Sequence, residues 1–350
     1  MQANLVGWDI GGAHLKAAAL NQAGEIIAIF QQPCPLWKGL EHLQQAVNAV
    51  MQALDSLPIS QHAITMTGEL VDLFTDRDDG VKQIINAMST LLAGTQISVF
   101  AGQSGLVPTE HIGIQHYAAI ASANWLASAL FAAQHVNNGL FVDIGTTTTD
   151  ILLLNDKQVL AQGYSDYQRL ISKELIYTGI IRTAVMAVAR TVEDEGHSVG
   201  LMAEYFATMA DVYRLTGELN ERHDQTDTAD GAEKTPLASA KRLARMIGCD
   251  ASSNTLPRWQ RLAKDIRRQQ LEHIQQGCQA QLQRHSGSIP ITFIGAGVGR
   301  FLVKEMAIEL GHAYLDFSSL LPSIMPQPDL SAADCAPAVA VAYLQRQTSQ

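Results

Sequence analysis

The chain has 350 residues, of which 24 are basic and 34 acidic, giving a formal net charge of −10 at pH 7. This length exceeds the usual size of one hydrophobic core and predicts two lobes. The acidic balance, with no basic tail, argues against nucleic acid or an anionic membrane surface as the main partner, so we expect small-molecule ligands.

Cysteine spacing and hydropathy exclude further classes. The four cysteines form no Cys-x-x-Cys pair, which argues against a zinc site or a disulfide framework. The N-terminus "MQANLVGWDIGG" lacks a signal-peptide pattern, and no run approaches the roughly 20 apolar residues of a membrane span. We therefore expect a cytoplasmic, soluble protein.

The first part of the chain alternates predicted strands and helices. Strands are predicted in "ANLVGWDIGG", "AHLKAAAL" and "EIIAIF", the last two joined by a turn at Ala23-Gly24. A helix in "GLEHLQQAVNAVMQAL" stops before Pro58, and "HAITMTGEL" is a strand that runs into a turn. Next come a helix in "GVKQIINAMSTLLAG", a strand in "QISVFAG" and a small-residue helix from Tyr117 to Ala133.

The second part begins by repeating the first. Residues 8–27, "WDIGGAHLKAAALNQAGEII", and residues 142–160, "VDIGTTTTDILLLNDKQVL", share an Asp-Ile-Gly turn, a second strand, an Asn-containing hairpin and a third strand. This pattern indicates an internal duplication. The alternative is two unrelated turns that both begin Asp-Ile-Gly.

The remaining elements are mostly helical. "SDYQRLISKELIYTGIIRTAVMAVA" is predicted to be helical or a turn leading into apolar structure, and "HSVGLMAEYFATMADVYRLTGEL" to contain a helix. Residues 220–235 are polar and predict an exposed loop. Helices follow in "PLASAKRLARMIGCD" and "LPRWQRLAKDIRRQQLEHIQQGCQAQLQRH". A strand, glycine turn and helix in "IPITFIGAGVGRFLVKEMAIELG" precede a C-terminal helix in "APAVAVAYLQRQ".

Both repeated turns carry groups that suit a phosphate. Buried hydroxyls without a partner cost on the order of 1–3 kcal/mol, so four consecutive threonines predict a turn that faces something polar. Glycines allow backbone N–H groups to approach phosphate oxygens, and threonine hydroxyls add uncharged donors. The predicted phosphate-binding residues are Gly11, Gly12, Gly145, Thr146, Thr147 and Thr148.

Charged residues beside these turns predict a metal site. Asp9 and Asp143 occupy the same place in the two repeats, and their hard oxygens suit a hydrated Mg²⁺ that bridges two phosphates. Lys16 on the following strand offers a positive charge to the same phosphates. The alternative makes the aspartates turn-forming residues and Lys16 a solvated lysine.

A third glycine turn lies near the C-terminus. "IGAGVGR", with Gly295, Gly297 and Arg300, has the character of a strand-to-helix phosphate or nucleotide turn. It is not the fingerprint of a dinucleotide-binding domain, because no βαβ unit and no acidic ribose partner follow it.

Two Asp-Ile-Gly turns followed by a late glycine turn resemble the superfamily of acetate kinase, sugar kinases, heat-shock ATPases and actin. The resemblance implies an α/β fold with two ribonuclease-H-like lobes around a central phosphate-binding cleft, one lobe at residues 1–134 and the other at 135–350. A helical insertion is expected at about residues 166–288.

A closer resemblance is to the hydantoinase/oxoprolinase-related family linked to tetrahydromethanopterin one-carbon transfer. It rests on "GWDIGGAHLKAA", "TMTGEL", "ASANW", "VDIGTTTTDI", "SDYQRLISKELIYTGIIRT", "ADVYRLTGEL" and "GAGVGRFLV". The resemblance implies a methanofuran-biosynthesis transferase that joins a furanylmethyl pyrophosphate to a tyramine- or tyrosine-derived phenol and releases pyrophosphate.

Further residues are assigned with this reaction in view. Asp9, Lys16 and Asp143 form the catalytic group around Mg²⁺, and Glu69 or Glu174 is the candidate base for the phenol, although each also suits a structural carboxylate. The candidate contacts to substrate are Arg169, Tyr177, Thr178 and Arg182, each of which also suits a packing or ion-pair role.

Two other functions use the same turns. A small-molecule kinase binds ATP with Gly295, Gly297 and Arg300 on the adenosine side, whereas an actin-like switch uses ATP to control protein partners. The transferase is favoured over both, and it needs Mg²⁺ but no ATP.

Overall fold

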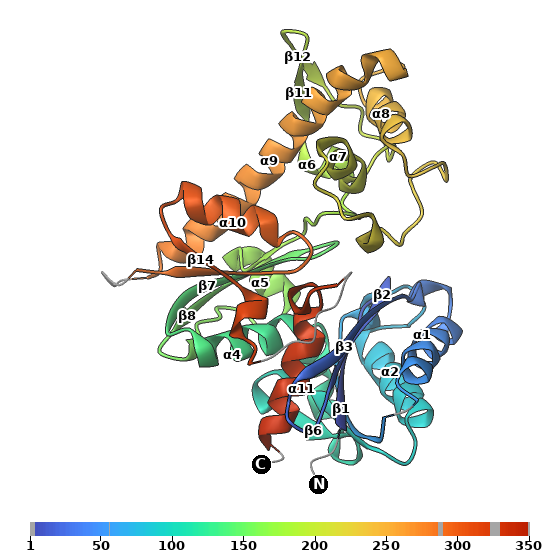
Figure 1. Cartoon of the computed structure of the whole chain (residues 1–350), viewed down its shortest axis with the longest axis vertical. Helices are drawn as coiled ribbons and strands as arrows, with labels where there is room; N and C mark the ends of the chain where they lie inside the picture. The colour runs from blue at the N-terminus through green and yellow to red at the C-terminus, as the bar shows by residue number, and fades with distance from the viewer. Residues whose placement is uncertain (1–3, 56, 286–289, 323–329, 349–350) are drawn as a thin grey trace. The chain divides into compact units, whose positions relative to one another are not determined.

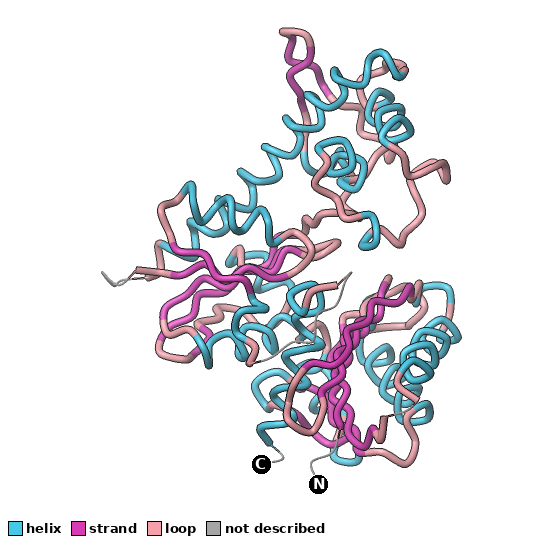
Figure 2. The backbone as a smooth tube through the Cα atoms, in the orientation of Figure 1, coloured by secondary structure: helices cyan, strands magenta, loops and turns pink. Residues whose placement is uncertain are grey.

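The computed structural model describes residues 4–55, 57–285, 290–322 and 330–348. They form two compact units, whose elements are labelled in Figure 1 and coloured by type in Figure 2. The first unit consists of the described residues of Met1–Phe141, Leu152–Ser172 and Leu315–Gln350, and the second of those of Val142–Ile151 and Lys173–Tyr314.

The first sheet has the strand order of a ribonuclease-H-like lobe. Its six strands run β3-β2-β1-β4-β5-β6. Strand β1 is antiparallel to β2 and parallel to β4, and β4 is parallel to β5. The strands are β1 (Asn4–Ile10), β2 (His14–Leu20), β3 (Ile26–Pro33), β4 (Ile59–Met66), β5 (Gln96–Phe100) and β6 (Leu106–Pro108).

Helices cover both faces of this sheet. Helices α1 (Leu40–Ala53) and α2 (Arg77–Leu91) pack on one face, and α11 (Ala336–Thr348) packs on the other (Figure 1). All seven residues of β1 are buried between these layers. A side chain at Gly7 would collide with the Ala338 carbonyl oxygen, so glycine allows the close approach of α11 to β1. Helices α3 (Ile114–Ile120), α4 (Asn124–His135) and α5 (Asp166–Ser172) also belong to this unit.

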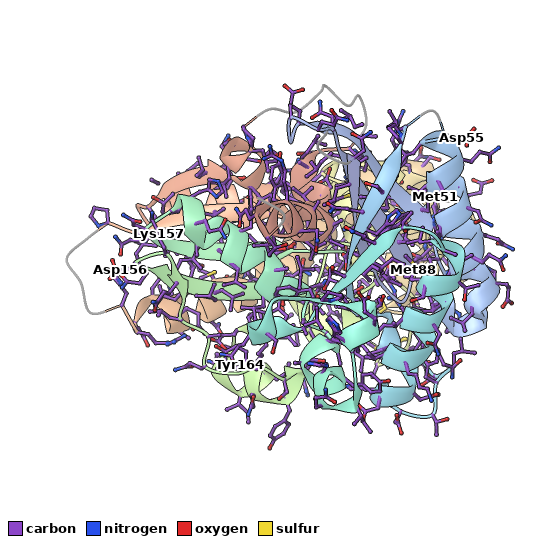
Figure 3. The ribbon with its side chains drawn as sticks, turned by 90° about the horizontal axis from the view of Figure 1, so that it is seen from below. Met51, Asp55, Met88, Asp156, Lys157 and Tyr164 are labelled. Atoms are coloured by element: carbon purple, nitrogen blue, oxygen red, sulfur yellow. The ribbon has the colours of Figure 1, made fainter. Side chains whose placement is uncertain are left out.

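The second sheet repeats the order of the first. It runs β10-β8-β7-β13-β14, with the short β9 also paired to β8. Its strands are β7 (Asn138–Ile144), β8 (Thr149–Asn155), β9 (Gln158–Val159), β10 (Leu175–Ile176), β13 (Thr292–Ala296) and β14 (Ala313–Asp316). Asp156 and Lys157, with φ of 49° and 61°, form the tip of the β8–β9 hairpin (Figure 3).

The same hydrogen bond closes both repeated turns. The Gly11 N–H donates to the His14 carbonyl, and the Gly145 N–H donates to the Thr148 carbonyl, each over 2.9 Å. Together with the matching strand orders, this bond confirms the predicted duplication. The fold is α/β, with two ribonuclease-H-like sheets and a helical insertion.

The insertion belongs to the second unit. It contains the hairpin β11 (Thr191–Asp194) and β12 (His197–Gly200), and the helices α6 (Val185–Val188), α7 (Met209–Thr216) and α8 (Pro236–Arg245). The long helix α9 (Leu256–Leu282) runs from these elements to the second sheet (Figure 1). There its Gly277 packs against Ile176 and Ile151. Helix α10 (Arg300–Glu309) follows β13.

Short 3₁₀ turns complete the inventory of helices. They are η1 (Leu36–Lys38), η2 (Gly68–Leu70), η3 (Gly102–Ser104), η4 (Thr109–His111), η5 (Glu221–His223), η6 (Ser253–Thr255), η7 (Phe317–Leu320) and η8 (Ala332–Cys335). None of the helices in the described ranges is both long and apolar enough to cross a membrane.

The prediction of one helix from Tyr117 to Ala133 is wrong. The structure breaks it into α3 and α4, and Ser122 at the break has a φ of 52°. Its hydroxyl donates to the Glu69 carboxylate over 2.7 Å. A partner on a distant element therefore stabilises a conformation that the small-residue run alone does not predict.

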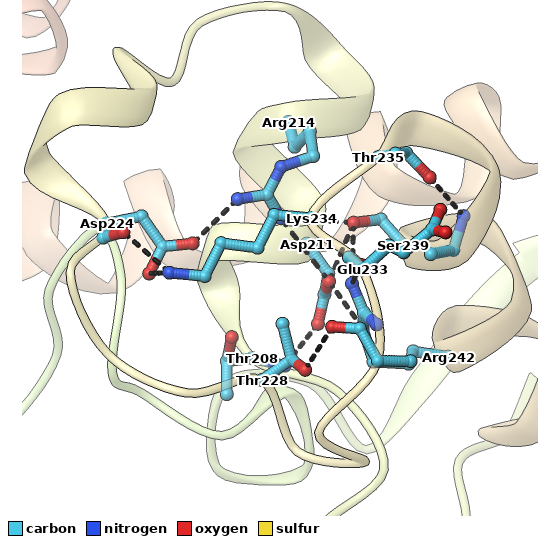
Figure 4. Close-up of polar contacts among 12 residues, drawn as sticks. Thr208, Asp211, Arg214, Asp224, Thr228, Glu233, Lys234, Thr235, Ser239 and Arg242 are labelled. Carbon is cyan, nitrogen blue, oxygen red and sulfur yellow. Dashed lines mark hydrogen bonds and ion pairs between the residues drawn. The ribbon is translucent and has the colours of Figure 1, made fainter.

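The prediction of an exposed loop at residues 220–235 is wrong in part. His223 and Asp224 are buried, and the Asp224 carboxylate accepts from Arg214 over 2.6 Å. Arg242 is fully buried and donates to Asp211 over 2.8 Å (Figure 4). It also donates to Asp230 over 3.0 Å. The polar composition reflects an ion-pair network that fastens this loop to α7 and α8, rather than a solvated loop.

Candidate functional site

The first turn places Asp9 and Lys16 side by side. They are direct partners across the β1–β2 hairpin, so their side chains share one face of the sheet. The Lys16 ammonium donates to the Asp334 carbonyl over 2.6 Å, and the Asn124 side chain at the start of α4 donates to Asp9 Oδ1 over 3.4 Å. A charged pair is thereby held at the end of β1, next to Gly11.

The two turns also resemble each other in their free donors. In the part of the chain that the structure describes, the N–H groups of Gly12 and Ala13 have no acceptor, nor do those of Thr146, Thr147 and Thr148. We call Gly145–Thr148 the threonine turn. Thr146, Thr147 and Thr148 are partly exposed, whereas Thr149 is buried. Consecutive N–H groups in such a turn form a concave donor surface that suits an anion.

The segment Thr178–Arg182 donates hydrogen bonds to carbonyl groups of the threonine turn. The Ile180 N–H donates to the Gly145 carbonyl over 3.0 Å, and the Arg182 N–H donates to the Thr146 carbonyl over 2.9 Å. These bonds satisfy the Gly145 and Thr146 carbonyl groups. The N–H groups of the threonine turn are then the backbone groups that can bind a ligand. The structure thus brings the predicted residues Thr178 and Arg182 to the threonine turn, with Thr178 buried and Arg182 exposed.

The late glycine turn packs against Asp143. Gly297 has a φ of 77°, and a side chain there would collide with Asp143 Oδ1 and with the Ile144 carbonyl. The Gly299 N–H donates to that carbonyl over 2.8 Å, and Arg300 donates to the Gly297 carbonyl over 3.0 Å. These contacts bring Asp143, Gly297 and Arg300 together.

Gly295 in the same turn has a different neighbour. A Cβ atom at this position would lie 2.7 Å from Cε2 of Tyr314. The aromatic ring of Tyr314 therefore fills the space that a side chain at Gly295 would need.

The two candidate bases differ in their surroundings. Glu69 is 1% exposed, and burial raises the pKa of its carboxyl group. Its Oε1 accepts from Ser122, whereas its Oε2 has no hydrogen-bond partner among the described residues. Glu174 is also buried, but Arg284 donates to its carboxylate over 3.2 Å. A carboxyl group with a raised pKa suits proton transfer better than one paired with arginine.

Arg169 and Tyr177 lie in contrasting environments. The Arg169 guanidinium is buried and lies 4.0 Å from the centre of the Trp125 ring, a distance typical of a cation–π contact. Tyr177 is 65% exposed and directly precedes Thr178. A substrate contact by either residue stays a prediction.

The chain fits a hydrated metal ion better than a fully protein-bound one. Among the described residues, no group of three or more His, Cys, Asp or Glu side chains could hold a metal. Mg²⁺ commonly keeps several waters and takes one or two carboxylates together with phosphate oxygens. Asp9 in the first unit and Asp143 in the second each lie beside a turn with N–H donors, and each fits that kind of binding within its own unit.

Sequence reasoning missed several residues that organise these turns. Ser122 and Asn124 contact Glu69 and Asp9, but their motif "ASANW" lay inside a predicted continuous helix. Gly179 is a second case, because a Cβ atom there would lie 2.5 Å from the Thr147 nitrogen. The serine and asparagine in a small-residue run were the one available signal for the helix break.

The two sheets and their strand orders define an α/β protein of ribonuclease-H-like architecture. A solved structure of acetone carboxylase in its nucleotide-free form has a TM-score of 0.55 and 11% identity, covering 97% of this chain and 70% of that one. Residues 61–342 match the family described as hydantoinase/oxoprolinase, and the chain belongs to this family. The resemblance noted in the sequence is thereby confirmed.

Two archaeal relatives share one name, (4-{4-[2-(gamma-L-glutamylamino)ethyl]phenoxymethyl}furan-2-yl)methanamine synthase. The protein of Methanocaldococcus jannaschii is 31% identical over 251 residues, which cover 71% of this chain and 73% of the relative. The protein of Methanococcus vannielii is 29% identical over 123 residues, covering 35% of this chain and 55% of the relative.

Proposed function

We propose that this protein is a transferase of methanofuran-type cofactor biosynthesis. It joins a furanylmethyl pyrophosphate to the phenol of a tyramine- or tyrosine-derived acceptor and releases pyrophosphate. The name of the archaeal relatives supports this reaction, because it describes a phenoxymethyl group on a furan, which is the ether that the reaction forms. The observation that carries the proposal is the threonine turn, with three free N–H donors beside Asp143.

The reaction exchanges one carbon–oxygen bond for another. The bond between the furanylmethyl carbon and the pyrophosphate oxygen breaks, and its electron pair stays on pyrophosphate. The phenol oxygen forms the new bond to the same carbon and loses its proton to a base. Glu69 is the proposed base, since its Oε2 atom has no other partner among the described residues.

The turns act on the leaving group. Negative charge grows on the pyrophosphate oxygens as the bond breaks, and preorganised N–H donors stabilise that charge without reorganising. In this proposal the threonine turn binds these oxygens. Gly11–Gly12, with the positive charge of Lys16, is the corresponding phosphate turn of the first unit. Asp143 would hold Mg²⁺ beside the threonine turn, and Asp9 is the corresponding carboxylate of the first unit; the ion would supply further neutralisation of the leaving pyrophosphate.

The packing at the late glycine turn supports a reaction without ATP. A kinase with its adenosine side at Gly295 and Gly297 needs space beside both residues. That space is filled by Tyr314 at Gly295, and by Asp143 and Ile144 at Gly297. In this proposal the late turn, predicted from the sequence as a phosphate or nucleotide turn, positions Asp143 instead of binding a nucleotide.

Isotope labelling of the acceptor tests this proposal. With ¹⁸O in the phenol, the transferase places the label in the ether, because the phenol oxygen attacks carbon and the donor oxygen leaves with pyrophosphate. Mass spectrometry of the product reads the label directly. Label in a phosphate ester, formed only with ATP, would instead identify a kinase.

A further inference from the structure

A buried glutamine links the insertion to the threonine turn. Gln270 on α9 is 0% exposed, and its Oε1 accepts from the Tyr213 hydroxyl of α7 over 2.6 Å. Its Nε2 donates to Thr178 Oγ1 over 2.7 Å and to the Gly179 carbonyl over 2.9 Å. Every hydrogen of this amide group and one of its acceptor sites are used.

The orientation of this amide is fixed by its partners. The Gly179 carbonyl is only an acceptor, so the nitrogen of Gln270 must face it. Burial raises the pKa of Tyr213, which keeps its hydroxyl protonated as the donor to Oε1. A flipped amide would set two oxygens against each other, and the structure therefore allows one arrangement.

Of the two residues that Gln270 holds, Gly179 is in contact with the threonine turn and Thr178 with Thr149, the residue that follows the turn. The Thr149 hydroxyl donates to the Thr178 carbonyl over 2.8 Å. Gly179 approaches so closely that a Cβ atom there would lie 2.5 Å from the Thr147 nitrogen and 2.7 Å from the Gly145 carbonyl oxygen. A shift of Gly179 must therefore be followed by a shift of the turn.

The helices that carry Gln270 and Tyr213 are themselves fastened together. Arg267, one turn before Gln270 on α9, donates to Glu218 after α7 over 2.7 Å and to Glu305 on α10 over 2.8 Å. The rings of Tyr213 and Phe301 of α10 meet edge to face, with 5.7 Å between their centres. These contacts fix the position of α9, and with it Gln270, relative to α7 and α10.

We propose that Gln270 is a positioning residue through which the helical insertion sets the direction of the N–H groups of the threonine turn for pyrophosphate. The inference rests on the proposed function, because it takes the threonine turn as the pyrophosphate site. Gln270 does not touch the ligand; it acts through Thr178 and Gly179.

Calorimetric titration with inorganic pyrophosphate and Mg²⁺ tests the role of Gln270. We expect Gln270→Leu to weaken the binding of pyrophosphate by about tenfold, which corresponds to about 1.4 kcal/mol. Tyr213→Phe leaves both donor bonds of Gln270 in place, so its affinity for pyrophosphate stays near that of the wild type. Thermal melts establish that each variant is folded.

The chain offers a matched control on the same helix. Gln281 is also fully buried on α9, about three turns further along, where its Oε1 accepts from Arg284 over 2.6 Å. Gln281→Leu removes a buried amide group from the same helix, and thermal melts measure its effect on stability, but we expect its affinity for pyrophosphate to stay within about twofold of the wild type.

The outcomes separate this inference from the proposed function. Folded Gln270→Leu with wild-type affinity overturns the positioning role while the pyrophosphate site stands, and so does an equal loss in Gln281→Leu. If Gln270→Leu does not fold, Thr178→Val removes the hydroxyl that Gln270 binds, and unchanged affinity in that variant overturns the role. A wild-type protein that binds no pyrophosphate overturns the proposed site itself, and the inference with it.

Discussion

Replacing Gly179 by alanine tests whether the packing of Gly179 against the threonine turn fixes the geometry of the turn. Gly179 does not have a positive φ, so alanine brings no backbone strain of its own. The new methyl group would lie 2.5 Å from the Thr147 nitrogen, where ordinary contacts begin at 3.4 Å. Because the colliding atoms are backbone, the turn must move by about 1 Å, and overpacking of this kind costs about 1–3 kcal/mol.

The displaced turn should bind its ligand poorly. Loss of one hydrogen bond to a charged ligand costs about 1.5–3 kcal/mol, which weakens pyrophosphate binding by roughly 10- to 100-fold. Urea denaturation gives the change in unfolding free energy, and calorimetric titration with inorganic pyrophosphate gives the affinity.

Gly200→Ala is the control for this substitution. Gly200 lies on β12 in the same unit, has no positive φ, and has no atom within 4 Å of its Cβ position. Alanine at Gly200 should leave the unfolding free energy and the affinity for pyrophosphate unchanged. If Gly179→Ala has the same unfolding free energy and the same affinity for pyrophosphate as Gly200→Ala, the segment Thr178–Arg182 does not fix the geometry of the threonine turn.

Three further predictions concern burial and charge. Arg242→Ala removes a fully buried cation that donates to Asp211, while Arg214 and Ser239 still contact that carboxylate, and should lower the unfolding free energy by about 1.5–3 kcal/mol. Arg245→Ala, at a 48% exposed side chain, should cost under about 1 kcal/mol in the same urea titrations. Burial lowers the pKa of His62 from 6.5 to about 4, so its contribution to stability is present above pH 6.5 and is lost as the pH falls toward 4. His62→Gln, which keeps an acceptor for the Trp8 indole, should flatten this pH dependence in thermal melts; an unchanged slope would reassign it to other groups. Asp143→Asn should abolish most Mg²⁺-dependent turnover while the fold stays intact, and near-normal turnover with normal metal affinity would overturn its role.

Local sequence patterns predicted the repeated core well. Apolar runs that end in glycine mark the ends of β1 and β7, and the repeated Asp-Ile-Gly motif predicted that both turns are built alike. These features depend on neighbouring residues only, and the strand order of each sheet follows from the same repeated unit. The threonine turn was therefore visible as a candidate anion site before the structure.

Long-range partners account for what the sequence did not reveal. The break at Ser122 depends on Glu69, and the burial of Asp224 within residues 220–235 depends on Arg214. Gln270 is one of several glutamines on a polar helix, and no local pattern sets it apart. Residues far apart in the chain meet only through the tertiary fold, so their roles could not be read from spacing.

The most direct test of the account is a turnover assay with furanylmethyl pyrophosphate and a phenolic acceptor, run with and without Mg²⁺ and always without ATP. We expect Mg²⁺-dependent formation of the aryl ether and release of pyrophosphate in equal amounts. Absence of ether under these conditions, together with specific binding of ATP, would contradict it and assign the two turns to a nucleotide.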